Sequence, residues 1–174
     1  MTRSIRYAVA TAVLSTGLGV VSAYPQGAAQ TETLNFTAVL SPANEVPPIA
    51  NGESKGSGEA TITLHLTRDA SKAITAATAD FKGSVKGFLA DTAITAAHIH
   101  RGAAGANGAV AVNPMFRAGD IALSDGAGAF SKMGVVVTPA VAQELVSGPA
   151  GFYFNVHSTM NPSGVARGQL AAAK

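Results

Sequence analysis

Apolar and polar residues alternate over many short stretches of the chain after residue 30. In LNFTAVL, residues 34–40, Leu34, Phe36 and every second residue after them share one face of an extended chain. EATITLHLT, residues 59–67, repeats the pattern with Ile, Leu and Leu on one face and Thr and His on the other. A period of two residues is typical of a half-buried β-strand. We predict further strands over 73–81, 94–101, 109–113, 119–124, 129–137, 151–158 and 165–171.

Turn residues separate these strands. The segment 41–58, SPANEVPPIANGESKGSG, is rich in Pro, Asn and Gly and predicts a loop. The Asp-Gly pair in SDGAGAF, residues 124–130, indicates a hairpin between two strands. The segment 138–149, TPAVAQELVSGP, is different because Thr138 suits an N-cap, Pro139 suits the first helical position, and its apolar residues have helical spacing. It predicts one short helix.

Many short strands and a single helix define the expected fold class. We predict an all-β protein, an antiparallel Greek-key β-sandwich or barrel with one short helix at an end of the sheets. The roughly 145 residues from residue 30 onward are enough for one domain that buries about two thirds of the surface of its unfolded chain.

The first residues are typical of an export signal. Arg3 and Arg6 precede the apolar run YAVATAVLSTGLGVVSA, and the small residue Ala23 suits cleavage before Tyr24. A second cleavage position follows Ala29. We therefore expect a signal peptide over residues 1–23, with cleavage as late as residue 29. The mature domain, residues 30–174, should be secreted or periplasmic, with no membrane attachment after cleavage.

Charge and cysteine content narrow the range of functions. The chain has 12 Lys and Arg against 10 Asp and Glu, so removing Arg3 and Arg6 leaves 10 of each. A neutral domain without a basic patch is not expected to bind nucleic acid. The chain has no cysteine, which excludes disulfides and thiolate metal sites. Any metal would need imidazole, carboxylate, thioether or backbone oxygen ligands.

Two of the four histidines lie one residue apart in AAHIHRGAAGANGAVAV, residues 96–112. On a strand, His98 and His100 point to the same face, with Cα atoms about 6.5 to 7 Å apart. Their rings can then share an ion at the usual metal–nitrogen distance of about 2 Å. The same spacing also suits a pair of polar surface residues, and the glycine-rich stretch after it is interpreted as a turn.

A third histidine lies on another predicted strand, in GFYFNVHSTMNP. Its alternation places His157 on the polar side, so it completes a three-imidazole site if the two strands are neighbours. Met160 follows in a loop, and a thioether there would favour copper, especially Cu(I). The alternative for Met160 is an apolar residue that fills a gap under the turn.

The remaining candidates carry weaker signals. His65 lies among outward-facing threonines and is interpreted as a solvated strand residue. Asp91 and Asp120 could supply oxygen ligands, but their neighbours are typical of turns. The sequence has no Gly-x-Ser-x-Gly elbow, phosphate-binding loop or His-Glu-x-x-His helix, so no catalytic residue is assigned.

Three segments together resemble a known family. VLSPANEVPP, AAHIHRGAAGANGAVAV and FYFNVHSTMNPSGVARGQL are similar, in order and spacing, to the CHRD domain, named after chordin and also found as a stand-alone exported domain in bacteria. The resemblance covers about residues 33–171 and implies an all-β sandwich. It places the family's HIH on His98 and His100, and its RGQL on Arg167 to Leu170. Family members often have an acidic residue two positions before the arginine, where this chain has Val165, so the resemblance supplies no acidic partner for Arg167 at that position.

A His-x-His strand in an exported Greek-key sandwich is also similar to copper–zinc superoxide dismutase. That enzyme family needs a bridging histidine, additional zinc ligands and a disulfide. This chain supplies none of them at matching positions.

The leading hypothesis is a secreted metal-binding β-sandwich that binds copper in preference to zinc. Its expected ligands are His98, His100 and His157, with Met160 as a fourth. Because ligation needs unprotonated imidazole, binding should weaken as pH falls through about 6.5. The alternative is an extracellular interaction module that binds a protein partner or the cell-surface matrix without metal, its histidines fixing the loop 102–108. A superoxide dismutase-like enzyme is the third hypothesis.

Overall fold

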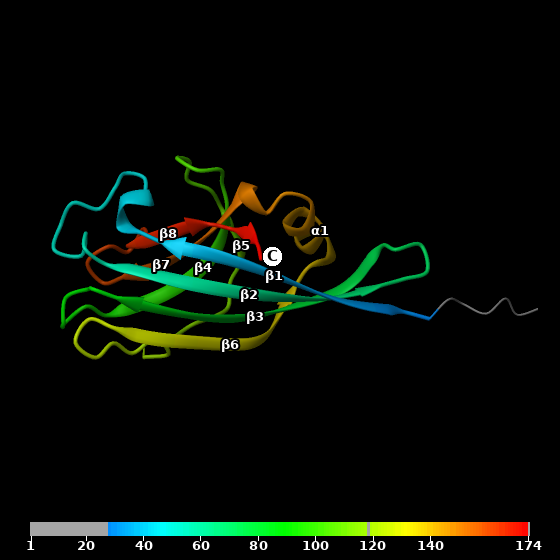
Figure 1. Cartoon of the computed structure of the whole chain (residues 1–174), viewed down its shortest axis with the longest axis horizontal. Coiled ribbons are helices and arrows are strands. Elements are labelled where there is room, and N and C mark those ends of the chain that lie inside the picture. The colour runs from blue at the N-terminus through cyan, green and yellow to red at the C-terminus, as the bar shows by residue number, and fades with distance from the viewer. Residues whose placement is uncertain (1–27, 118, 174) are drawn as a thin grey trace, which may run out of the picture.

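The computed structural model describes residues 28–117 and 119–173, which form two antiparallel β-sheets (Figure 1). The predicted signal peptide, residues 1–23, lies outside the described residues. The strand order is β6-β3-β2-β1-β9 in one sheet and β5-β4-β7-β8 in the other. The strands are β1 (Gln30–Leu40), β2 (Ser57–Arg68), β3 (Ile74–Lys86), β4 (Ile94–Arg101), β5 (Val110–Val112), β6 (Gly128–Val137), β7 (Phe152–Ser158), β8 (Ala166–Gln169) and β9 (Ala171–Ala172).

The predicted all-β sandwich is confirmed, with three differences in the strands, the first being that β3 continues to Lys86, beyond the predicted 73–81. Residues 119–124 form no strand beyond a single bridge between Ser124 and Ala127. Asp125 and Gly126 have φ angles of 50° and 73° and turn the chain at once, and from Gly128 onward the chain pairs with β3 instead. The predicted strand 165–171 is divided, because β8 pairs with β7 and β9 pairs with β1.

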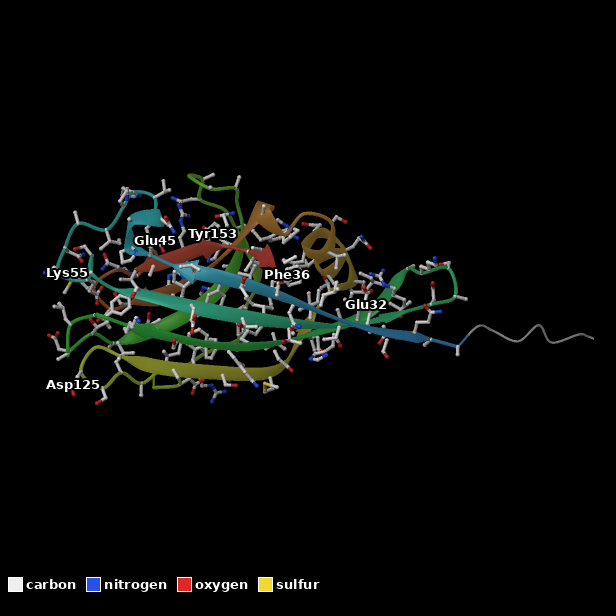
Figure 2. The ribbon with its side chains drawn as sticks, in the orientation of Figure 1. Glu32, Phe36, Glu45, Lys55, Asp125 and Tyr153 are labelled. Carbon is white, nitrogen blue, oxygen red and sulfur yellow. The ribbon has the colours of Figure 1, made fainter. Side chains whose placement is uncertain are left out.

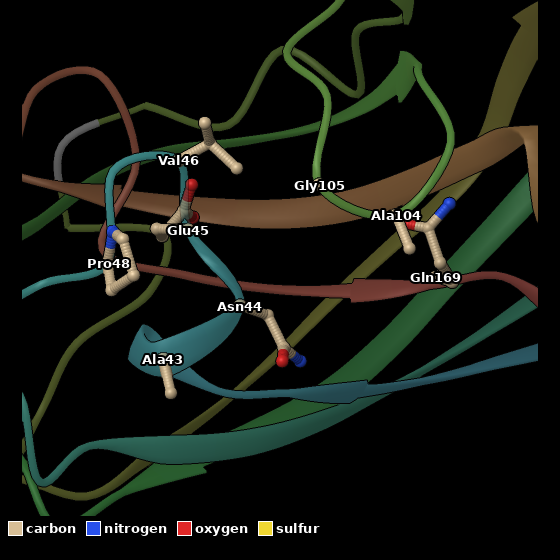
Figure 3. A pocket seen from close by; sticks show the side chains of 8 residues that line it. All are labelled: Ala43, Asn44, Glu45, Val46, Pro48, Ala104, Gly105 and Gln169. Carbon is tan, nitrogen blue, oxygen red and sulfur yellow. The ribbon is translucent and has the colours of Figure 1, made fainter.

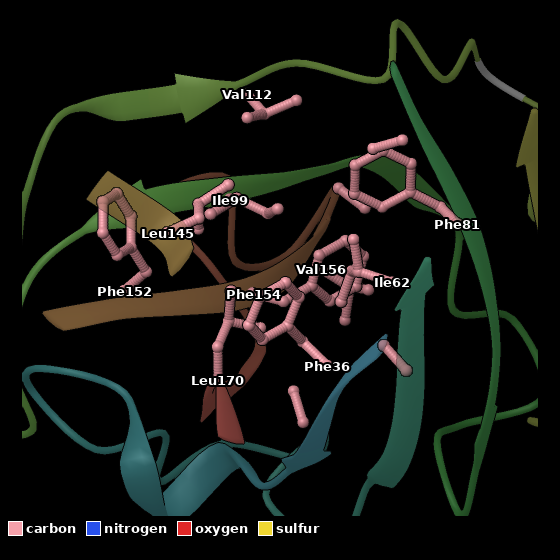
Figure 4. Packing of buried hydrophobic residues seen from close by; sticks show 14 of the residues in the cluster. Phe36, Ile62, Phe81, Ile99, Val112, Leu145, Phe152, Phe154, Val156 and Leu170 are labelled. Atoms are coloured by element: carbon pink, nitrogen blue, oxygen red, sulfur yellow. The ribbon is translucent and has the colours of Figure 1, made fainter. Parts of the chain in front are cut away.

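The core lies between the two sheets and follows the predicted alternation. Phe81 of β3 faces Phe154 of β7, with ring centroids 6.1 Å apart (Figure 4). Phe130 of β6 stacks on the same Phe154 ring, with centroids 5.8 Å apart. Phe36 and Ile62, from the first two predicted strands, are also buried there. Burial of each large apolar side chain contributes about 1.5–3 kcal/mol. Packing therefore stabilises a fold that has no disulfide.

The predicted helix is present as α1 (Pro139–Ser147). The Thr138 side chain caps it by accepting a hydrogen bond from the backbone N–H of Val141. Its apolar face buries Leu145 in the core (Figure 4). No helix among the described residues has the length and apolar character needed to cross a membrane.

The four-stranded sheet is covered on both faces. Every residue of β7 is buried, including those that point away from the core. Two loops cover this second face: the loop 41–56, which includes a 3₁₀ turn at Pro42–Asn44, and the loop 102–108. Arg167 of β8 joins them, since its Nε donates to the Asn44 carbonyl and its Nη1 to the Asn107 side chain. The loops therefore enclose a polar layer outside the sandwich.

Candidate metal centre

Pairing between β4 and β7 brings the three predicted histidines together. The two strands are antiparallel neighbours, with His98 opposite Asn155 and Ala96 opposite His157. His98 and His100 share the outer face of β4, and His157 lies on the same face of β7. The sequence could not establish that these strands are neighbours, and the pairing supplies the missing condition for a three-histidine site.

The three rings form a compact group. One nitrogen from each of His98, His100 and His157 lies within 4.8 Å of the other two, as ligands of a single metal ion would. The closest pair is His98 Nδ1 and His157 Nε2, at 3.0 Å. Ring centroids are 4.9 Å apart for this pair and 5.6 Å for His98 and His100. The three histidines could therefore hold a metal ion.

Hydrogen bonds to backbone oxygens determine which ring nitrogen of His100 and of His157 keeps a lone pair for a metal ion. His100 Nδ1 donates to the Gly108 carbonyl at 2.9 Å, and His157 Nδ1 donates to the Pro162 carbonyl at 3.0 Å. In each neutral ring the lone pair is then on Nε2. His100 Nε2 is buried and has no hydrogen-bond partner. A buried nitrogen with an unpaired lone pair is costly unless something binds it.

Burial favours the neutral form of His98 and His157. Desolvation, followed by the nearby His157 and His100, lowers the pKa of His98 to about 4. Desolvation also lowers the pKa of His157, although its bond to Pro162 acts in the opposite direction. Neutral imidazole is the form that binds metals. The weakening of metal binding as pH falls through about 6.5 stays a prediction, and the lowered pKa values of His98 and His157 favour their ligand form at lower pH.

A matching family model covers most of the chain, from residue 36 to residue 170, and it describes the CHRD domain. The chain belongs to the CHRD domain family. Searches of curated proteins and of solved structures find no match. The match agrees with the extent of the resemblance in the sequence and contains all three clustered histidines.

In this CHRD domain, Arg167 has an acidic partner that sequence analysis missed. The Glu45 carboxylate lies 3.6 Å from Arg167 Nε, and both side chains are buried. Glu45 comes from the loop 41–56 instead of the position two before the arginine, where Val165 is buried in the core. Figure 2 shows Glu45 and Tyr153 on the same side of the molecule. The signal was in the VLSPANEVPP motif, but only the fold shows what its glutamate contacts.

Opposing effects act on the Glu45 carboxyl group. Burial raises its pKa to about 7, while the charge of Arg167 and the side-chain amide of Asn155 act to lower it. A pocket of about 450 Å³ lies beside Glu45, between the two covering loops (Figure 3). Its lining includes Asn44, Val46, Gly105 and Gln169.

Tyr153 connects the arginine to the histidines. Its ring stacks on His100, with centroids 5.0 Å apart and planes 4° from parallel, and the Arg167 guanidinium carbon lies 4.5 Å from the same ring's centroid. Its hydroxyl also accepts a hydrogen bond from the Gly108 N–H at 3.3 Å. The orientation of His100 is therefore fixed by a ring on one side and a loop carbonyl at its Nδ1.

The glycine-rich loop has a larger role than the turn predicted from sequence. A Cβ at Gly108 would lie 1.3 Å from the carbonyl oxygen of Arg101, so only glycine fits there. This close approach presents the Gly108 carbonyl to His100. The loop is therefore part of the site, as well as the connection between β4 and β5.

The other sequence candidates lie elsewhere. Met160 is 51% exposed and lines a second pocket with Asn161 and Gly164, so its role as a ligand stays a prediction. His65 is paired with Asp80 at 3.0 Å on the five-stranded sheet. Asp91 is an exposed turn residue, and Asp120 accepts from the Arg117 N–H and lies 3.5 Å from Lys132. Neither aspartate belongs to the histidine group.

Proposed function

We propose that this CHRD domain is a secreted metal-binding protein that binds copper through His98, His100 and His157. The observation that carries the proposal is His100 Nε2, a buried lone pair without a hydrogen-bond partner, next to two further imidazoles. A bound cation would satisfy that nitrogen and would occupy the space the three rings share. Secretion is proposed from the signal-like residues 1–23.

Copper is proposed over zinc on general coordination chemistry. Three neutral imidazoles suit Cu(II) and zinc equally, and the Irving–Williams order favours Cu(II). Three protein ligands also leave a fourth position. Met160 was the candidate for it from sequence, and a thioether at that position would favour Cu(I).

An interaction module without metal is the second candidate. It is favoured by the hydrogen bonds of His100 and His157 to backbone oxygens, which by themselves hold the loops 102–108 and 159–164 against the sheet. Such bonds are also what metal-binding histidines use to fix the ring and its tautomer. The two functions differ in what they require of Nε2: metal binding needs its lone pair, and loop attachment does not.

Metal titration tests the proposal. Purified mature protein is titrated with Cu(II), Cu(I) and zinc, and so are the His98→Ala/His100→Ala double variant and the His65→Ala variant. We expect a single tight Cu(II) site in the wild type and in His65→Ala, and its loss in the double variant. Equal weak binding by all three proteins would contradict the proposal and favour the interaction module.

A further inference from the structure

We propose that Asn155 supplies the fourth ligand of this site through its side-chain oxygen, Oδ1. The inference rests on the proposed three-histidine site and adds a ligand of a different chemical class. It replaces the thioether of Met160 with an amide oxygen, so it changes which metal ions the site selects.

Two hydrogen-bond acceptors face each other at the centre of the site. The neutral His157 ring carries its proton on Nδ1, which donates to the Pro162 carbonyl, so Nε2 is a lone pair. Asn155 Oδ1 is 3.1 Å from that Nε2, and an amide oxygen also only accepts. No proton is available between these two atoms, and in the absence of a cation the Nε2 lone pair accepts its hydrogen bond from His98 Nδ1, at 3.0 Å, and not from Asn155. A metal ion in place of that proton would give His157 Nε2, His98 Nδ1 and Asn155 Oδ1 a common partner.

The direction of the Asn155 amide is fixed from its other end. A Cβ on Gly164 would lie 2.8 Å from Asn155 Nδ2 and 2.8 Å from Glu45 Oε1, so the amide nitrogen and the carboxylate share this corner. The side-chain amide of Asn155 donates to the Glu45 carboxyl group, a hydrogen bond that acts to lower the pKa of Glu45 and places Nδ2 on that side. Oδ1 is left pointing toward the histidines. Glu45 is in this sense a positioning residue for the ligand.

Asn155 also has the location that a ligand needs. It is 1% exposed, and it lies opposite His98 in the pairing of β4 and β7. His98 Nδ1 and Asn155 Oδ1 thus approach the same atom, His157 Nε2, at 3.0 and 3.1 Å. Met160, in contrast, is half exposed in the loop after β7. The rigid strand residue is better placed than the loop residue to complete the site.

An oxygen ligand has a consequence for selectivity. Three imidazoles with an amide oxygen favour divalent ions, Cu(II) and zinc, whereas a thioether favours Cu(I). The proposal therefore predicts that the ratio of Cu(II) to Cu(I) affinity depends on Asn155 and is independent of Met160.

Matched variants test this. Asn155→Leu removes the oxygen at similar volume, and Met160→Leu removes the sulfur. We expect Asn155→Leu to weaken Cu(II) and zinc binding by at least about tenfold, the scale on which ligand-shell groups act, and to change Cu(I) affinity less. Met160→Leu should change each affinity less than about twofold. A larger effect of Met160→Leu on Cu(I), with Asn155→Leu unchanged, would overturn the inference.

A measurement on the wild type covers the case in which Asn155→Leu fails to fold. The ¹⁵N and ¹H resonances of the Asn155 side-chain amide are followed by NMR while zinc is added. Coordination through Oδ1 predicts a shift of this amide together with the His98, His100 and His157 rings. Ring shifts without an amide shift would refute the Asn155 ligand and leave the three-histidine site intact. Absence of any ring shift would instead count against the proposed function.

Discussion

The Nδ1 atom of His98 lies 3.0 Å from the Nε2 atom of His157, although 59 residues separate them in the chain. The contact exists because β4 and β7 pair directly and their outer faces are covered by loops. Burial then keeps the rings neutral, as the lowered pKa values of His98 and His157 indicate. Geometry and protonation state together produce a site suited to a cation.

The stability of the metal-free protein should depend on His98 as pH falls. The pKa of His98 is about 4 when folded and near 6.5 in the unfolded chain, so the unfolded state binds more protons in between. The contribution of His98 to the free energy of unfolding is fully present above pH 6.5 and is lost as pH falls toward 4. Glu45 acts in the opposite sense, because its pKa is raised to about 7 and its burial costs stability as pH rises from about 4.5 to 7.

Comparison with a His98→Gln variant separates the two groups, since Glu45 titrates in both proteins. Chemical unfolding with a chelator present, at several pH values from 7.5 to 4, gives the difference in unfolding free energy. We expect the wild type to lose stability relative to the variant as pH falls from 6.5. A difference that stays constant over this range would contradict the assigned pKa.

Substitution of the buried residue Arg167 should lower the free energy of unfolding more than most other substitutions in the fold. It is 2% exposed, its Nη1 also donates to the Ala106 carbonyl, and it is the cation beside Glu45. Arg167→Met leaves a buried carboxylate without its partner, which costs about 3–5 kcal/mol of unfolding free energy.

Arg101 offers a matched control for that substitution. Its ion pair with Glu144, at 2.7 Å, joins side chains that are 42% and 46% exposed. Arg101→Met should therefore cost less than about 1 kcal/mol. Urea unfolding of both variants checks the contrast, and similar losses in the two would mean that the buried pair has no special role. Adding Glu45→Gln to Arg167→Met should restore part of the stability.

Glu53 should be a second sensitive position. It is 1% exposed and accepts from the Thr92 hydroxyl at 2.9 Å and the Ser158 hydroxyl at 2.6 Å, and Asn161 also donates to it. Glu53→Ala leaves these donors without an acceptor. Each donor that stays buried and unpaired should lower the free energy of unfolding by about 1–3 kcal/mol. Thermal unfolding should show a clear fall in midpoint, whereas Glu59→Ala, at an exposed position of β2, should change it little. Equal midpoints for both variants would argue against an anchoring role for Glu53.

The Gly164→Ala variant tests whether close packing at residue 164 orients the side-chain amide of Asn155. Its φ is +134°, and a Cβ there would lie 2.8–2.9 Å from Asn155 Nδ2 and both Glu45 oxygens. Gly164→Ala is expected to destabilise the fold through backbone strain and to displace the Asn155 amide. The side-chain amide resonance of Asn155 reports the displacement, and an unchanged resonance would show that the corner tolerates a methyl group.

Local patterns predicted the sheets well because alternation depends only on neighbouring residues. The burial of Phe36 and Ile62 and the Thr138 cap follow from their own segments. The loss of the predicted strand 119–124 has a nonlocal cause, since β6 pairs with β3 and leaves that segment without a partner.

The site was predictable only in part for the same reason. Polar residues on β7 indicate a solvated face, yet loops bury them, and no periodicity reports that a distant loop folds over a strand. Glu45 lies in a family motif, but no local pattern marked it as the partner of Arg167, and none singled out Asn155 as a site residue. The histidines were found because His-x-His spacing is itself a local pattern.

X-ray absorption of the copper-loaded protein tests the central claim most directly. The wild type and His65→Ala should each show nitrogen or oxygen neighbours at about 2.0 Å, with the outer-shell scattering of three imidazoles. His98→Ala/His100→Ala should retain no copper after unbound metal is removed, and so should lose this spectrum. A wild-type spectrum without imidazole scattering, or one that the double substitution leaves unchanged, would contradict a copper site at His98, His100 and His157.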